Sequence, residues 1–244
     1  MSAEQKEIIG KDGVLMVLIP AGEFLMGSPA GKGHFNEYPQ HKVFLSAYYI
    51  DKYEVTVAQY RKFCEATGRK MPSAPSWGWI DTHPVVNVFW YDAVTYAQYY
   101  GKCLPTEAEW EKACRAGTTT AFHYGDSLNS EQANFHGRYP YESVNKCIYR
   151  KQTTPVGSFQ PNVFGLYDMH GNVWEWCSDL YDQNYYANSP EYNPQGATNG
   201  SDRVMRGGSW YNNAENCRSA YRGRGFPEYG GSLKGFRCAY PMSP

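Results

Sequence analysis

The cysteines and histidines are the residues of this chain with the widest choice of chemistry. Seven cysteines occur, and none form a CxxC pair, so their spacing argues against a structural zinc site. The six histidines include no pair at i, i+4 spacing on an expected helix. A serine hydrolase is also disfavoured, because the chain has no GxSxG motif. We therefore expect most thiols to be reduced and packed as small apolar side chains.

One cysteine lies in an unusual setting near the end of the chain. The segment from Arg206 to Cys238 reads RGGSWYNNAENCRSAYRGRGFPEYGGSLKGFRC, with Cys217 in its middle. Glycine, tyrosine and arginine dominate this segment. It is either an active site built on Cys217 or a surface that contacts a ligand, and the elements around it must position it in either case.

Strand patterns open the chain. Residues 13–28, GVLMVLIPAGEFLMGS, predict a strand, a Pro-Ala-Gly turn and a second short strand. Residues 41–56, HKVFLSAYYIDKYEVT, form another β-rich run. After residue 117 the regular signals fade, yet many Trp and Phe residues remain and charge is low. We therefore expect ordered loops and short strands there, not a disordered tail.

Three helices are expected between these regions. They run from Thr56 to Gly68, from Asp92 to Gly101 and from Thr106 to Gly117, with a glycine as the stop in each case. Thr56 and Thr106 are each followed three residues later by Gln59 and Glu109, which is the spacing of a capping box. Apolar residues at helical spacing then give each helix a face to bury.

Composition limits the classes of function. The chain has 244 residues with a formal net charge of −1, so it lacks the basic surface expected for nucleic acid or an anionic membrane. No apolar run approaches the roughly 20 residues of a membrane helix. The first residues lack the blocks of a signal peptide, so the chain as written is expected to be soluble and cytoplasmic. We see no linker, and we expect one domain over residues 1–244.

Several blocks together resemble the formylglycine-generating enzyme family, the sulfatase-modifying-factor domain. The landmarks are IPAGEFLMGS, YYIDKYEVT, HPVVNVFWYDAVTYAQYYGKCLPTEAEWEKACRAG, ANF, PVGSFQPNVFGLYDMHGNVWEWCSD, RVMRGGSW and GFRCA, in family order from about residue 14 to 239. The resemblance implies an α+β domain with a C-type-lectin-like core and little regular secondary structure. Function is a separate question, because one fold hosts several activities.

The oxidases of this family use two cysteines spaced CxxxxC after the GGS-aromatic motif. Two close thiolates can bind a soft metal and exchange disulfides with a substrate cysteine. Here Asn212 occupies the first position, and Cys217 falls on the second when counted from the Gly-Gly-Ser side. An amide cannot replace a thiolate as a soft ligand, so the site is incomplete. Cys217 is expected to be a packed thiol, and a cysteine oxidase or an oxidase-like accessory protein is the alternative function.

Iron-dependent relatives need an HxxxHxE motif in an extra domain, and this sequence has neither. The third kind of relative is the variable protein of diversity-generating retroelements, whose template tail carries asparagines on a constant frame. The frame RGGSW, NAENCRSA and GFRCA is present here. Tyr, Gly, Phe and Ser stand at many of the asparagine positions, and all four are reachable from AAC codons by adenine changes alone.

This resemblance implies that residues 206–238 form a variable region that binds a protein or other macromolecular ligand. The candidate ligand-binding residues are Tyr211, Asn213, Tyr221, Gly223, Gly225, Phe226, Tyr229, Gly231 and Ser232. Tyrosine gives large contact area with few rotatable bonds, while Ser and Gly adapt, as in antibody paratopes. The frame arginines 206, 218, 222 and 237 are expected to clamp loops through carbonyls and carboxylates. The alternative is ordinary variation within the family.

The block GLYDMHGNVWEW matches a calcium site of the family. Carried over by position, Asp168 and Glu175 would supply carboxylates, and Gly171 and Val173 backbone carbonyls, which suits the hard Ca²⁺ ion. Alternatively, the two carboxylates only accept hydrogen bonds from loop amides. Cys114 and Cys238 match a pair that is bonded in some secreted relatives, and we expect them to be close together and reduced.

Overall fold

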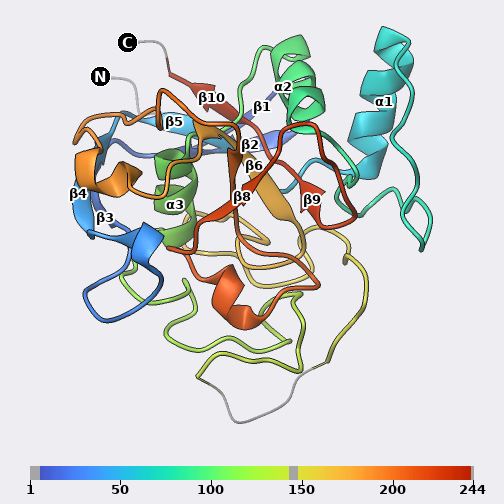
Figure 1. Ribbon diagram of the computed structural model, residues 1–244. Helices are drawn as coiled ribbons and strands as arrows, with labels where there is room; N and C mark the ends of the chain where they lie inside the picture. The colour runs from blue at the N-terminus through green and yellow to red at the C-terminus, as the bar shows by residue number, and fades with distance from the viewer. Residues whose placement is uncertain (1–5, 143–147, 243–244) are drawn as a thin grey trace.

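The computed structural model describes residues 6–142 and 148–242, whose strands form three sheets (Figure 1). The first sheet has the order β1-β2-β5-β10 and consists of β1 (Glu7–Ile9), β2 (Leu15–Ile19), β5 (Tyr48–Asp51) and β10 (Ala239–Pro241). A separate hairpin pairs β3 (Gly22–Met26) with β4 (His41–Leu45). The third sheet has the order β8-β7-β6-β9 and consists of β6 (Trp174–Leu180), β7 (Arg203–Arg206), β8 (Gly223–Gly225) and β9 (Lys234–Gly235). Only the β6–β9 pair is parallel among these strand pairs.

The three predicted helices are confirmed as α1 (Val57–Thr67), α2 (Trp90–Tyr99) and α3 (Glu107–Arg115). Both predicted capping boxes form at the starts of α1 and α3. α2 begins two residues earlier than predicted, because Asp92 is its third residue and accepts a hydrogen bond from the Phe89 N–H at 3.0 Å. The left-handed residue that ends α3 is Ala116, with φ of 46°, one residue before the predicted stop at Gly117.

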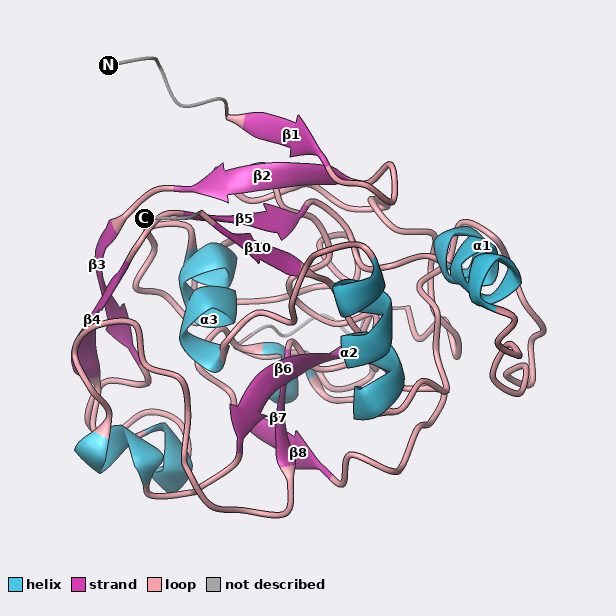
Figure 2. Ribbon diagram, turned by 90° about the horizontal axis from the view of Figure 1, so that it is seen from above, coloured by secondary structure: helices cyan, strands magenta, loops and turns pink. Residues whose placement is uncertain are grey.

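The elements stack in layers. Figure 2 shows α2 and α3 between the first sheet and the third sheet, with α1 at one side. One core cluster joins the first sheet, α3 and the third sheet, with Ile50, Trp110 and Val204 among its members. A second core cluster packs α1 and α2 against Trp176 and Phe236. The first and last strands, β1 and β10, lie in the first sheet, whereas β8 and β9 of the C-terminal segment belong to the third sheet.

The α+β class and the low content of regular structure are confirmed. Between α3 and β6 the described chain has no helix or strand, yet it encloses a third core cluster that includes Phe122 and Phe135, both fully buried. Cys217 and Ala214 of the C-terminal segment pack into the same cluster. The long loops are thus ordered by their aromatic residues, as the sequence predicts.

Candidate ligand-binding face

Four arginines of the C-terminal segment hold it to the rest of the fold. None of them is more than 4% exposed. Each pairs with a glutamate from an earlier part of the chain: Arg206 with Glu111, Arg218 with Glu37, Arg222 with Glu107 and Arg237 with Glu175. In the last three pairs, two guanidinium nitrogens meet the two carboxylate oxygens at 2.7–2.8 Å. The predicted role of these arginines as clamps is confirmed.

Each buried arginine needs its glutamate partner, because a buried charge without a partner is strongly unfavourable. Burial would raise the pKa of Glu111, but Arg115 and Arg206 hold it below its usual value. Arg206 also donates to the backbone oxygens of Ser219, Ala220 and Tyr221. A single side chain therefore fixes both a charge in α3 and the turn that leads into β8.

The residues predicted to bind ligand lie outside this buried frame to different degrees. Tyr211, Phe226 and Tyr229 are 55%, 56% and 66% exposed. Asn213 is exposed, whereas Gly231 and Ser232 are partly exposed. Trp210 ties two parts of the set together, because its Nε1 donates to the Ser232 oxygen at 2.9 Å.

The set around β8 is more enclosed than the sequence suggests. Tyr221 is partly buried, and its ring packs edge-on to His34 at 5.3 Å and near Trp174 at 5.9 Å. Gly223 and Gly225 follow at alternate positions, so they share one face of the strand while Arg222 points inward.

The glycines of the candidate set differ in the room they offer a side chain. A Cβ on Gly223 would lie 2.7 Å from the ring of Trp174, and one on Gly225 would lie 3.0 Å from the ring of Trp176. A Cβ on Gly231 would meet nothing within 4 Å. Larger residues at the first two positions therefore require a tryptophan to move, whereas Gly231 is open to substitution.

A groove of about 740 Å³ runs beside Tyr229. Gly230 and Gly231 form one wall, and Met71 and Phe89 are among the residues that line it from the α1–α2 region. Phe89 is 44% exposed and directly precedes α2, of which only Ala93, Tyr96 and Ala97 are buried. Sequence reasoning missed this wall, because nothing in the residue pattern before α2 distinguishes an exposed aromatic side chain from a core one.

A cluster of aromatic rings surrounds Trp210 near Tyr211. Trp77 packs edge-on to Trp210 with ring centroids 5.4 Å apart, and Tyr149 stacks on His136 at 3.8 Å. The Tyr211 ring lies 5.6 Å from Trp210 and 6.1 Å from His136. Buried His136 Nδ1 has no hydrogen-bond partner among the described residues. The cluster extends the candidate face beyond residues 206–238, and only its irregular loops bring these rings together.

Cys217 does not form a reactive pair. It is fully buried, and burial raises the pKa of its thiol, which keeps the sulfur protonated. A Cβ built on Gly208 would lie 2.6 Å from its Sγ, so backbone closes over it. At the position of the missing first cysteine, the Asn212 oxygen accepts a hydrogen bond from the Ser209 hydroxyl at 2.6 Å. The expectation of a packed thiol is confirmed.

The expected neighbourhood of Cys114 and Cys238 is wrong. Both thiols are free, and they belong to different core clusters. Cys114 lies 3.5 Å from the Ser219 hydroxyl, whereas Cys238 donates its backbone N–H to Asp51 at 2.9 Å. The match by position failed because the C-terminal segment passes α3 at Ser219, well before it reaches Cys238.

Of the two carboxylates predicted to bind calcium, Asp168 fits the role better than Glu175. Asp168 has φ of 58°, its Oδ2 accepts from the Gly157 N–H at 2.6 Å, and its buried Oδ1 has no partner. That free oxygen fits a hard cation. Glu175 fits less well, because Arg237 and Trp110 already occupy its two oxygens. Glu54 adds a third buried carboxyl group. It lies outside the sequence motif, and it accepts a hydrogen bond from the Asn172 side chain.

Burial raises the pKa of Asp168 to about 6 and raises the pKa of Glu54 as well. Three acidic groups with one guanidinium leave an excess of negative charge unless protons or a cation compensate. No group of three or more metal-binding side chains occurs within residues 6–142 and 148–242. Within the same ranges, no helix is long and apolar enough to cross a membrane.

Comparison with known families and curated proteins places this architecture. The family described as "Sulfatase-modifying factor enzyme 1-like domain" matches residues 5–242. A formylglycine-generating enzyme of Streptomyces coelicolor is 36% identical, over 91% of this chain and 88% of that protein. The serine/threonine-protein kinase pkn1 of Chlamydia caviae is 37% identical over 92% of this chain, but the matched part is only 37% of the kinase.

Two solved structures share the fold over nearly their whole length. PvdO from Pseudomonas aeruginosa has a TM-score of 0.84 at 28% identity, covering 98% of this chain and 100% of that one. Treponema denticola variable protein 1 has a TM-score of 0.75 at 26% identity, covering 98% and 99%. The overall fold is thus shared by proteins with different names.

Proposed function

This chain belongs to the family of sulfatase-modifying factor enzyme 1-like domains, and we propose that it is a non-enzymatic member that binds a protein or other macromolecular ligand. The proposed binding site is the C-terminal face, residues 206–238, together with the aromatic cluster and groove beside it. We further propose that this face is diversified in the manner of a retroelement variable protein. The likeness to Treponema denticola variable protein 1 supports this proposal.

One observation carries the proposal: the segment separates a buried frame from an exposed set. The arginines at 206, 218, 222 and 237 are at most 4% exposed, while Tyr211, Phe226 and Tyr229 are more than half exposed. Exposed aromatic side chains on loops held by a rigid scaffold are typical of recognition surfaces. Because the frame arginines are buried, an open position outside them, such as Gly231, can change without disturbing the frame.

Binding can be tested by panning a phage-displayed library of random peptides against the whole chain. Enriched peptides are then measured against Tyr211→Ala and Tyr229→Ala, with Tyr192→Ala as the matched control. Tyr192 is 65% exposed and also contacts one aromatic ring, but it lies beside β4. Loss of a central aromatic contact commonly weakens binding by about tenfold or more.

We expect the two variants of the C-terminal face to lose that affinity and Tyr192→Ala to retain it. Equal effects of all three substitutions would refute the proposed site. Diversification is tested on the nucleotide sequence: codons at positions 211–232 should differ from a nearby template only at adenines. Differences at other bases would remove that part of the proposal.

We also propose that Ca²⁺ binds at Asp168 with the backbone oxygens of Gly171 and Val173, while Glu175 stays engaged with Arg237 and Trp110. The unpartnered Asp168 Oδ1 supports this, and the ion would balance the excess negative charge there. A ligand that binds only the folded state adds about 2.7 kcal/mol of stability at 100 times its Kd. Ca²⁺ added after chelation should therefore raise the unfolding temperature of the chain but not of Asp168→Asn. An equal rise for both, or none, contradicts the site.

The second candidate function is oxidation of a substrate cysteine to formylglycine. The 36% identity to the Streptomyces coelicolor enzyme favours it. Asn212 in the first cysteine position and the buried thiol of Cys217 argue against it. Incubation with Cu(I), oxygen and a peptide carrying CxPxR decides the matter. Formylglycine in the peptide by mass spectrometry would establish the oxidase and overturn the non-enzymatic proposal.

A further inference from the structure

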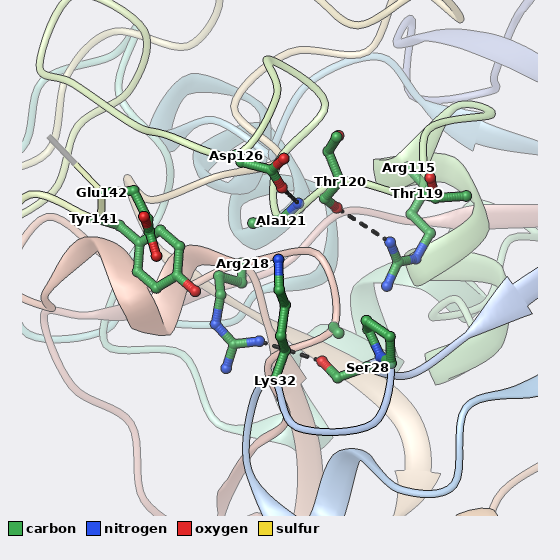
Figure 3. Close-up of a pocket in the computed structure, with 12 residues that line it drawn as sticks. Ser28, Lys32, Arg115, Thr119, Thr120, Ala121, Asp126, Tyr141, Glu142 and Arg218 are labelled. Carbon is green, nitrogen blue, oxygen red and sulfur yellow. Dashed lines mark hydrogen bonds between the residues drawn. The ribbon is translucent and has the colours of Figure 1, made fainter.

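A pocket of about 250 Å³ is lined by Arg218 and Ala220 of the C-terminal segment together with residues from two earlier loops (Figure 3). Three stretches of chain enclose it: the loop after β3, the loop after α3 and the chain that follows Cys217. None of the nine candidate ligand-binding residues lines it. Ligand pockets for drug-sized molecules are about 300–1,000 Å³, so this volume suits a smaller molecule.

One lining residue, Arg115, belongs to a buried network with surplus positive charge, whereas Arg218 is paired with Glu37. Arg115 and Arg218 line the pocket, and each is only 4% exposed. Arg115 is the outer member of a chain of ion pairs with three guanidiniums and two carboxylates: Arg115, Glu111, Arg206, Glu107 and Arg222. Burial raises the pKa of the nearby Asp179 to about 7, so that carboxyl group offsets the surplus only in part at neutral pH.

Lys32 adds a further positive charge. Figure 3 shows its side chain reaching into the middle of the pocket, beside Arg218. Its Nζ has no hydrogen-bond or ion-pair partner in the described part of the chain, and neither has Arg218 Nε. Arg115 donates to the oxygens of Thr120 and Gly27 and still has N–H groups to spare, because a guanidinium carries five. Donors from three residues thus line the same small pocket, with Lys32 between Arg218 and Arg115 in Figure 3.

Two acidic side chains face the same space. Asp126 lines the pocket beyond the tip of Lys32, and Glu142 lines it at another side (Figure 3). Both are exposed, and neither forms an ion pair within 4.0 Å in the described residues. Asp126 accepts a single hydrogen bond, from the Ala121 N–H at 3.2 Å. The pocket therefore offers cationic donors and free carboxylates within a space of one small molecule.

We propose that this pocket binds a free α-amino acid. The ligand carboxylate would accept hydrogen bonds from Lys32, Arg115 and Arg218, and its ammonium group would donate to Asp126 and Glu142. An inorganic anion matches only the first set and would be repelled by the second. A simple amine has the opposite defect, so a small zwitterion is the class that satisfies both sets.

The test is isothermal titration calorimetry of the whole chain with each standard L-amino acid. The amino acid that binds best is then compared with its N-acetyl derivative, which lacks the ammonium group, and its amide, which lacks the carboxylate. Sodium phosphate serves as the anion probe. A hydrogen bond to a charged group contributes about 1.5–3 kcal/mol, so each derivative should bind at least about tenfold more weakly.

Lys32→Met and Asp126→Asn should each weaken binding by a similar factor. Lys62→Met and Glu131→Gln are the matched controls, since both residues are exposed and do not line the pocket. Thermal unfolding of every variant excludes misfolding as the cause. Saturable binding of no amino acid at millimolar concentration, binding of phosphate alone, or equal losses in test and control variants would each overturn the proposal. Because no residue of the C-terminal face is altered, the outcome is separate from that of the proposed function.

Discussion

The buried arginines make a sharp prediction about two nearby arginines, one just before β8 and one within it. Arg222 and Arg224 are separated by a single residue, Gly223. Arg222 is 4% exposed, meets both oxygens of Glu107 at 2.7 and 2.8 Å, and donates to the backbone oxygen of Asn36 at 2.8 Å. The Arg224 side chain is 63% exposed and comes no closer than 3.6 Å to its one acidic partner.

Replacing each arginine by methionine keeps most of the side-chain length and removes the charge. Loss of one partner from a buried ion pair commonly costs about 3–5 kcal/mol, because the other charge stays buried. Glu107 keeps the more distant Arg206, at 3.7 Å, so the lower half of that range is expected for Arg222→Met. An exposed pair contributes about 0–1 kcal/mol, so Arg224→Met should change the free energy of unfolding by less than about 1 kcal/mol.

Urea unfolding followed by tryptophan fluorescence and by circular dichroism measures both values. Coincident transitions justify the two-state treatment, and an unchanged m-value shows that the unfolded state is not altered. Arg222→Lys keeps a charge without the planar fork and should fall between the two. If Arg222→Met and Arg224→Met destabilise the chain equally, or if the former costs less than about 1 kcal/mol, the assignment of Arg222 to a structural frame is refuted.

Three further predictions follow from burial and from open space. Gly223→Ala should lower the free energy of unfolding by about 1–3 kcal/mol, because the added methyl group would overpack against Trp174. Gly231→Ala should not lower it, because a Cβ there meets nothing within 4 Å; thermal unfolding compares the two variants. Burial raises the pKa of Asp179 from 3.8 to about 7, so stability should fall as pH rises from 4 to 8, and Asp179→Asn should weaken this dependence; equal slopes in urea titrations contradict it. Thiol labelling of the unfolded, unreduced chain should modify both Cys114 and Cys238, and protection of the two together would contradict the structure.

The local elements could be predicted because their signals lie within a few residues. The capping boxes at Thr56 and Thr106 mark the starts of α1 and α3 correctly. The end of α3 was placed one residue late, because a non-glycine residue, Ala116, takes the left-handed conformation there. A short-range pattern cannot show that tertiary contacts stabilise such a conformation.

The candidate site also has features that the sequence predicts and contacts that it does not. The motif showed that a cysteine pair was missing, since Asn212 stands where the first thiol belongs, and it identified the frame arginines as clamps. It could not show that Trp174 lies against Gly223 or that Phe89 faces Tyr229 across a groove. Those pairs are far apart in the chain, and only the closure of long loops determines which side chains meet.

The sequence by itself determined the family, the capped helices and the set of frame arginines. Each of these is a matter of residue type at fixed spacing. Only the tertiary structure decided that Cys114 and Cys238 lie in different cores, that each frame arginine has its own buried glutamate, and that Lys32 and Asp126 share a pocket. The reason is physical: a buried charge must find its partner wherever the chain brings one, and that distance is not written in the spacing of residues.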